Sequence, residues 1–119
     1  PFFTLDERKR IISKVTEHIP NIEIDVFDGL LAEYVNKHGF EAVVRGLRAT
    51  TDFEYEIQMA QMNARLYTGG TETVFLMTDP RYSFISSSLI KEVVSYGGDV
   101  DGLLPDYANE MIKTKVDNQ

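Results

Sequence analysis

The chain has 119 residues and a formal net charge of −7 at pH 7; 43% of its residues are hydrophobic and 26% are charged. This length and composition predict a single domain over residues 1–119 with a packed core. The acidic balance argues against broad binding of nucleic acid or of acidic membranes, which needs a positive field, but it allows a small anion held by a few local cations.

Two absences narrow the class of protein further. The chain has no cysteine, which excludes disulfides, thiolate metal ligands and a thiol nucleophile, and which fits a reducing cytosol. No apolar run approaches the roughly 18 to 20 residues of a membrane span, and no signal peptide is visible. We therefore expect a cytoplasmic protein that binds neither nucleic acid nor membrane.

The first predicted elements are a helix and a strand. Thr4 followed by Glu7 is a capping box, and the apolar spacing after it predicts an amphipathic helix over residues 5–19. Apolar residues alternate with acidic residues over 22–26, which predicts a strand with one face toward water or at the edge of a sheet.

The alternation of helices and strands continues to the end of the chain. Apolar residues over 30–35 predict a helix that Gly39 ends. A second capping box, Thr51 with Glu54, opens a helix that extends to about Leu66. The remaining predicted elements are a short buried strand at residues 42–44, a strand at 73–77, a helix around 89–94 and a last helix from Pro105.

Strands and helices that alternate in this way predict an α/β domain with a parallel sheet flanked by helices. In such sheets, ligands bind beyond the carboxyl ends of the strands. This rule places three loops on one rim, at residues 28–29, 45–48 and 78–88. Arg45 and Arg48 therefore belong to the functional edge of the sheet rather than to its core.

The same rim is predicted to bind an anion. Arg45 and Arg48 need a partner, because arginine is rarely buried without one. Ser86, Ser87 and Ser88 occupy the first turn of a helix, where free backbone N–H groups and the helix dipole attract anions. Plain N-capping is the alternative, because serine is a preferred cap residue. Together the two features point to phosphate, and a polyphosphate would suit both.

Several long segments carry a family resemblance over essentially the whole chain. RGLRATTDFEYEIQMAQMN, ETVFLM and YSFISSSLIKEV, together with FTLDER, FDGLL and GGDV, resemble bacterial phosphopantetheine adenylyltransferase. The resemblance implies a Rossmann-like fold of the nucleotidyltransferase superfamily that usually assembles as a hexamer. It implies transfer of the adenylyl group of ATP to 4′-phosphopantetheine, with Mg²⁺, in coenzyme A biosynthesis. The products would be dephospho-coenzyme A, which leads to coenzyme A, and pyrophosphate.

The resemblance also assigns site residues by position. Arg45 matches a residue that contacts phosphopantetheine, and Leu31 matches a residue that lines the site of that substrate. Glu56 matches an ATP-contacting carboxylate, although by itself it is typical of a solvated charge on a helix. The other positions that match ATP contacts are Gly46, Leu47, Arg48, Tyr82, Ser83, Phe84, Ile85, Ser86, Ser87 and Ser88.

One part of the family pattern is absent from these residues. In the family, the first strand leads into a glycine turn ending x-G-H, whose histidine stabilises the transition state. The histidines of this chain are His18, in the predicted last turn of the first helix, and His38, just before Gly39, and we expect both to be solvated. The family's substrate-binding lysine falls upstream of Pro1. We therefore expect that an opening strand-helix-strand of about 40 residues is missing, and we assign no catalytic residue and no metal ligand here.

Two other functions remain open. The first is a related nucleotidyltransferase with another acceptor, against which the matches at Leu31 and Arg45 weigh. The second is a catalytically silent assembly or binding module. Two apolar stripes on the predicted helix 51–66 favour an interface, because a helix that is apolar on two sides is usually buried on both. The alternative is that both stripes belong to the core of the chain itself. The stripes are Phe53, Ile57, Ala60 and Ala64, and Met59, Met62 and Leu66.

Overall fold

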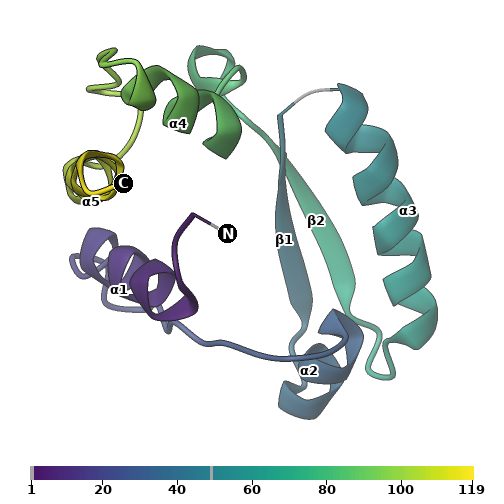
Figure 1. Ribbon diagram of the computed structural model, residues 1–119. Helices are drawn as coiled ribbons and strands as arrows, with labels where there is room; N and C mark the ends of the chain where they lie inside the picture. Colours follow the sequence, from purple (N-terminus) through teal and green to yellow (C-terminus); the bar gives the residue numbers. More distant parts are fainter. Residues whose placement is uncertain (1, 49) are drawn as a thin grey trace. The chain divides into compact units, whose positions relative to one another are not determined.

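The computed structural model describes residues 2–48 and 50–119, without the side chains of residues 50 and 51. The chain divides into two compact units, Pro1–Val26 with Ile85–Gln119 and Phe27–Phe84, and each unit is described by itself. The prediction of a single domain stays a prediction. The elements in chain order (Figure 1) are α1 (Leu5–Val15), α2 (Leu31–His38), β1 (Ala42–Leu47), α3 (Thr50–Leu66), β2 (Glu72–Met77), the short 3-10 helix η1 (Pro80–Tyr82), α4 (Ser87–Ser95) and α5 (Asp106–Asp117).

The unit Phe27–Phe84 is built on a parallel pair of strands. β1 and β2 pair in parallel, with Val43 opposite Thr73 and Leu47 opposite Met77. Parallel strands need a crossover connection, and α3 supplies it (Figure 1). The predicted α/β class, a parallel sheet flanked by helices, is confirmed. The carboxyl ends of both strands also lie at one edge, where the Thr78 N–H donates to the Leu47 carbonyl at 2.8 Å.

The strand that carries Arg45 is longer than the sequence indicates. We predicted that it ends at Val44, whereas β1 runs to Leu47, so Arg45 and Gly46 lie within the strand and only Arg48 follows it. The extension forms because the backbone of 45–47 finds partners on β2, residue for residue as far as Met77. Arg45 is therefore held by a sheet ladder rather than by a turn.

Two other predictions, the end of the first helix and the strand at residues 22–26, are wrong. The first helix ends at Val15 instead of residue 19, because the Thr16 hydroxyl turns back to the Ile12 carbonyl at 2.7 Å and the chain leaves the helix there. Residues 22–26 form no strand in the structure. A strand must pair its backbone N–H and C=O groups, and no described segment pairs with these residues.

The other unit packs α4 and α5 around a small apolar core. Its buried members are Ile90, Val94, Val100 and Ile112, and Phe2, Phe3 and several aliphatic side chains pack against them. No helix in the described ranges is long and apolar enough to span a membrane.

The predicted capping box at the start of α1 is confirmed. The Glu7 N–H donates to the Thr4 hydroxyl at 3.1 Å, and the Thr4 N–H donates to Glu7 Oε1 at 3.0 Å. Lys115 Nζ of α5 also contacts Glu7 Oε1 at 2.6 Å, and this hydrogen bond, with that from Thr4, lowers the pKa of Glu7 from 4.5 to about 2. The predicted box at Thr51 and Glu54 involves a side chain outside the described part.

Candidate functional site

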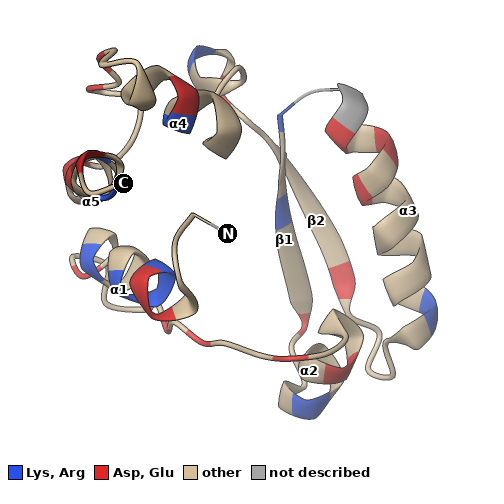
Figure 2. Cartoon of the chain, in the orientation of Figure 1, with Lys and Arg blue, Asp and Glu red and all other residues tan. Residues whose placement is uncertain are grey.

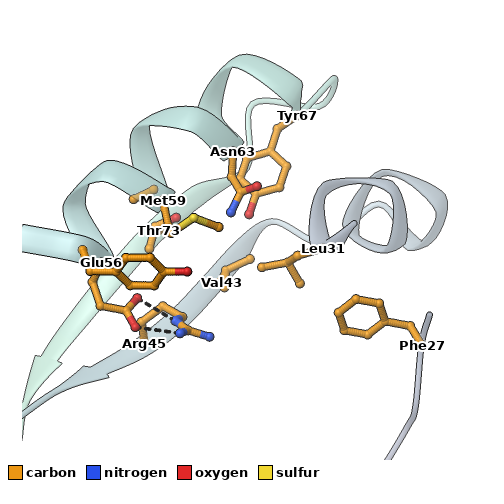
Figure 3. Close-up of a pocket in the computed structure, with 11 residues that line it drawn as sticks. Phe27, Leu31, Val43, Arg45, Glu56, Met59, Asn63, Tyr67 and Thr73 are labelled. Carbon is orange, nitrogen blue, oxygen red and sulfur yellow. Dashed lines mark hydrogen bonds and ion pairs between the residues drawn. The ribbon is translucent and has the colours of Figure 1, made fainter. Parts of the chain in front are cut away.

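A pocket of about 280 Å³ lies between β1 and α3 in the unit Phe27–Phe84 (Figure 3). The residues that line it come from the segment before α2 and the start of that helix, from both strands, and from α3 and the residue directly after it. They are Phe27, Leu31, Val43, Arg45, Tyr55, Glu56, Met59, Ala60, Asn63, Tyr67 and Thr73. Three of the residues that we assigned from the sequence, Leu31, Arg45 and Glu56, therefore share one pocket.

Arg45 and Glu56 form a bidentate ion pair at one end of the pocket. Arg45 Nε donates to Glu56 Oε2 at 2.9 Å, and Arg45 Nη2 donates to Glu56 Oε1 at 2.7 Å. The Glu56 side chain is 14% exposed, so it is not the solvated helix charge that its sequence context alone suggests. The hydrogen bonds raise the pKa of Arg45 and lower the pKa of Glu56, so both groups stay charged at neutral pH.

The free side of Arg45 is its Nη1 group. The Arg45 side chain is 46% exposed, and among the described residues its hydrogen bonds go only to Glu56, through Nε and Nη2. A guanidinium has five N–H donors in a rigid fork. Arg45 can therefore keep its contact with Glu56 and still offer donors to an anionic ligand.

The end of β1 places the other arginine differently. Arg48 follows the strand, and its Nε donates to Asp52 Oδ2 at 3.0 Å. Figure 2 shows basic positions within and just after β1 and acidic positions in the first turns of α3, which agrees with the two ion pairs between these segments. Leu47 is only 3% exposed, so a ligand would reach this residue through its backbone. Gly46 lies opposite Leu76 in the sheet.

The segment after β2 forms a compact turn. Asp79 caps η1, and its carboxylate accepts from the Arg81 backbone N–H at 2.9 Å. Tyr82 ends η1, the Ser83 hydroxyl donates to the Pro80 carbonyl at 3.1 Å, and the Phe84 side chain is exposed. None of these side chains lines the pocket between β1 and α3.

The serines begin α4, as the sequence predicts. Ser86 is the N-cap, and its hydroxyl accepts from the Leu89 N–H at 3.2 Å. Ser87 and Ser88 are the first two helical residues, and both are exposed. The three serines and Ile85 belong to the unit of the two termini, so a common rim with Arg45 and Arg48 stays a prediction.

The two histidines lie outside the pocket. His18 is in the turn after α1 rather than in its last turn, because α1 is shorter than we predicted. His38 is the last residue of α2, as expected, and its ring packs against Tyr34 and Phe40 at centroid distances of 4.5 and 5.2 Å. In the part of the chain that the structure describes, no group of three or more His, Cys, Asp and Glu side chains could hold a metal ion.

Sequence reasoning missed several residues of the pocket. Tyr55, Met59, Asn63 and Tyr67 follow one another at intervals of four, which places them on one ridge of α3 and its end. The sequence prediction places Met59 in an apolar stripe of this helix and assigns no role to Tyr55, Asn63 and Tyr67. The spacing of polar residues around Met59 was the available signal.

The comparisons with known proteins agree with one another. Residues 1–93 match the family described as Cytidylyltransferase-like. The chain is 47% identical over 117 residues to the phosphopantetheine adenylyltransferase of Corynebacterium efficiens, and the matched region covers 98% of this chain and 72% of that protein. It is 46% identical over 115 residues to the protein of the same name from Caldanaerobacter subterraneus (97% and 71%). For the Corynebacterium diphtheriae protein of that name, the identity is 49% over 114 residues (96% and 70%).

Proposed function

The chain belongs to the phosphopantetheine adenylyltransferase family, and from this premise we propose that it transfers the adenylyl group of ATP to 4′-phosphopantetheine in coenzyme A biosynthesis. The products are dephospho-coenzyme A and pyrophosphate. The observation that carries the proposal in the structure is the pocket that holds Arg45 and Glu56 at one end.

The pocket suits the acceptor substrate, which has a phosphate at one end and a long, weakly polar arm. Arg45 binds the phosphate, because a guanidinium stays charged and can grip phosphate oxygens with more than one N–H. Glu56 fixes the orientation of Arg45 through the two hydrogen bonds between them. Leu31 and Met59 supply apolar surface beside the arm.

ATP is bound, in this proposal, by two segments. Gly46, Leu47 and Arg48 at the end of β1 approach the nucleotide, and Glu56 contacts it from α3. The segment 82–88 approaches it at the start of α4, where the free N–H groups of the first helical turn attract phosphate. The hydroxyls of Ser87 and Ser88 are exposed there and can donate to phosphate oxygens.

The reaction is an in-line displacement at phosphorus. A phosphate oxygen of 4′-phosphopantetheine forms a bond to the α-phosphorus of ATP, and the bond between that phosphorus and the bridging oxygen breaks, so that pyrophosphate leaves with its electron pair. No protein nucleophile takes part. The contribution of the protein is to hold the two substrates in line and to offset their negative charge.

Mg²⁺ is the proposed cofactor. It is commonly bound by one or two carboxylates, waters and substrate phosphates rather than by a dedicated protein cage. The described residues hold no group of three or more His, Cys, Asp and Glu side chains that could bind a metal ion, so we propose that the substrate phosphates and waters supply most of the ligands of Mg²⁺. When bound, Mg²⁺ neutralises part of the charge on the phosphates. Arg45 and Arg48 act separately, as fixed cations near the end of β1.

Further parts of the site come from outside these residues in our proposal. A histidine in an x-G-H turn and a substrate-binding lysine, as in the family, are contributed by an N-terminal segment. We also propose a homo-oligomer, a hexamer as is usual in the family. Its support is that Phe53, Met62 and Leu66 of α3 are 42–57% exposed, although apolar side chains gain from burial.

The test of the proposed function is the substitution Arg45→Ala in the full-length protein. A hydrogen bond to a charged group contributes about 1.5–3 kcal/mol, so the specificity constant for 4′-phosphopantetheine should fall roughly 10- to 150-fold. The KM for ATP should change much less. Arg65→Ala removes the same charge from an exposed position of α3 that does not line the pocket and should behave as wild type. Unchanged kinetics for the acceptor in Arg45→Ala would remove Arg45 from the site.

A further inference from the structure

The pocket contains a second polar end that the proposed contacts leave unused. Tyr67 directly follows α3, and its hydroxyl is buried without a hydrogen-bond partner among the described residues. The same residue lines the pocket. A buried polar group without a partner costs free energy, and such a group in a folded protein calls for an explanation. A ligand that reaches the hydroxyl would provide the missing partner.

Asn63 lies beside Tyr67 at this end of the pocket. The Tyr67 backbone N–H donates to the Asn63 carbonyl at 2.9 Å, so the helical spacing continues and the two side chains lie on one ridge. Figure 3 shows both side chains at the end of the pocket away from Arg45 and Glu56. Asn63 thus places a second hydrogen-bonding group near the Tyr67 hydroxyl.

The two polar ends are separated by an apolar middle. Asn63 follows Glu56 by seven residues, which is about 10 Å along a helix at about 1.5 Å per residue. Val43 and Met59 lie between these two ends (Figure 3). Of the described lining residues, Arg45 is the one with a basic side chain, so the end near Tyr67 suits a neutral polar group and not a second phosphate.

We infer that the Tyr67 hydroxyl determines specificity for the acceptor. It forms a hydrogen bond with an amide of the pantetheine arm. The inference rests on the proposed function. With the acceptor phosphate on Arg45, an extended arm passes the apolar middle and brings an amide to Tyr67. An acceptor without that amide leaves the buried hydroxyl unpaired, and sites of this kind discriminate strongly against such analogues.

The experiment is the substitution Tyr67→Phe in the full-length protein, with Tyr96→Phe as the matched control. Tyr96 is 86% exposed and lies in the other unit, so the control removes the same hydroxyl outside the pocket. In Tyr67→Phe, the KM for 4′-phosphopantetheine should rise about 5- to 10-fold, which corresponds to about 1–1.4 kcal/mol. The kcat and the KM for ATP should stay at the wild-type values. The thermal unfolding midpoint should not fall, since the hydroxyl has no partner within the described protein.

Binding of a second phosphorylated compound shows whether Tyr67 contacts the amide or has only a structural role. Butyl phosphate carries the phosphate but no amide, so Tyr67→Phe and wild type should bind it equally in a calorimetric titration, while the variant binds 4′-phosphopantetheine about 5- to 10-fold more weakly. Equal binding of 4′-phosphopantetheine by both proteins would overturn the inference.

The outcomes also distinguish the inference from the proposed function. If wild type transfers adenylyl groups to 4′-phosphopantetheine and Tyr67→Phe has the same KM, the role of Tyr67 alone is refuted. If wild type shows no transfer but Tyr67→Phe still weakens calorimetric binding of 4′-phosphopantetheine, the binding role stands and the proposed reaction fails.

Discussion

The Glu56 carboxylate accepts two hydrogen bonds from Arg45 and thereby determines where that guanidinium points. Glu56 also offsets the positive charge of Arg45. Arg45 therefore gives the pocket a set of hydrogen-bond donors with a fixed direction rather than a large positive field. An arginine fixed in this way loses less side-chain freedom when a phosphate binds than a mobile arginine would.

Glu56→Gln tests this orienting role. The amide keeps the shape of the carboxylate but has a single acceptor oxygen, so it can accept one of the two present hydrogen bonds in the same geometry. The KM for 4′-phosphopantetheine should rise by less than in Arg45→Ala, about 2- to 13-fold, given about 0.5–1.5 kcal/mol for a hydrogen bond. Glu110→Gln, at an exposed position of α5, should have wild-type kinetics. A wild-type KM in Glu56→Gln would show that Arg45 needs no such support.

The sequence pointed to Arg45 and Glu56 as site residues, but it did not predict the contact between them. Arg45 was found from a charged side chain at the end of an apolar run, and Glu56 from the resemblance. Their mutual contact joins a strand to a helix 11 residues later, and depends on how α3 packs on β1, which local spacing does not encode. The unpaired hydroxyl of Tyr67 is likewise a property of packing.

The start of α4 separates two tasks among neighbouring serines. Ser86 caps the helix through its hydroxyl, whereas no hydrogen bond from the Ser87 or Ser88 hydroxyl to a described residue is present. The cap stabilises the helix, and the two exposed hydroxyls are available to a ligand. Of the two alternatives that the sequence left open, capping falls on Ser86, and anion binding by Ser87 and Ser88 stays a prediction.

Substitutions at these serines should affect different properties, stability for Ser86 and nucleotide binding for Ser87 and Ser88. Ser86→Ala should lower the free energy of unfolding by about 0.5–2 kcal/mol, the usual contribution of a cap. Ser87→Ala with Ser88→Ala should leave stability within about 0.5 kcal/mol, as expected for surface positions, and should raise the KM for ATP. Chemical denaturation and steady-state kinetics measure the two effects. A double variant with an unchanged KM for ATP would exclude the two hydroxyls from nucleotide binding.

The contact between α1 and α5 should make stability depend on pH. The pKa of Glu7 is about 2 in the folded chain and 4.5 in the absence of its partners. The ionised form is therefore favoured by folding, and its contribution is complete above pH 4.5 and is lost as the pH falls toward 2. Lys115→Met, which removes the main partner, should reduce this decline. Urea unfolding at a series of pH values tests this prediction, and Lys9→Met, at an exposed position, is the control. If the free energy of unfolding falls equally with pH in Lys115→Met and wild type, the prediction is contradicted.

Helices were easier to predict than strands for a physical reason. A helix satisfies its backbone within itself, so the capping box at Thr4 and the glycine at Gly39 locate helix ends from local sequence. A strand needs a neighbour. Residues 22–26 have a clear alternation but no partner in the described chain, whereas β1 is lengthened by its partner β2.

The whole molecule has a sheet of two strands in its described part. Val44, Val74 and Leu76 share the face of the sheet opposite to the pocket, and they are 61%, 43% and 58% exposed. Exposed strand edges and apolar faces favour further pairing or association. Added strands and helices would bury this surface, which agrees with our proposal that an N-terminal segment completes the site.

The 119-residue chain by itself should accordingly show no adenylyl transfer and a tendency to associate. Adding the N-terminal segment that we propose, of about 40 residues, fused or as a companion peptide, should restore both activity and a defined mass in light scattering. Robust turnover by the 119 residues alone would refute this division of the site and require another catalytic group within them.

The most direct test of the central claim is the formation of dephospho-coenzyme A by the full-length protein from ATP, 4′-phosphopantetheine and Mg²⁺. Pyrophosphate release and the mass of the product should be measured together, with each substrate omitted in turn. We predict that pyrophosphate forms only when both substrates are present and in equal amount to dephospho-coenzyme A. Transfer to a different phosphorylated acceptor in preference to 4′-phosphopantetheine, or no transfer at all, would contradict the account.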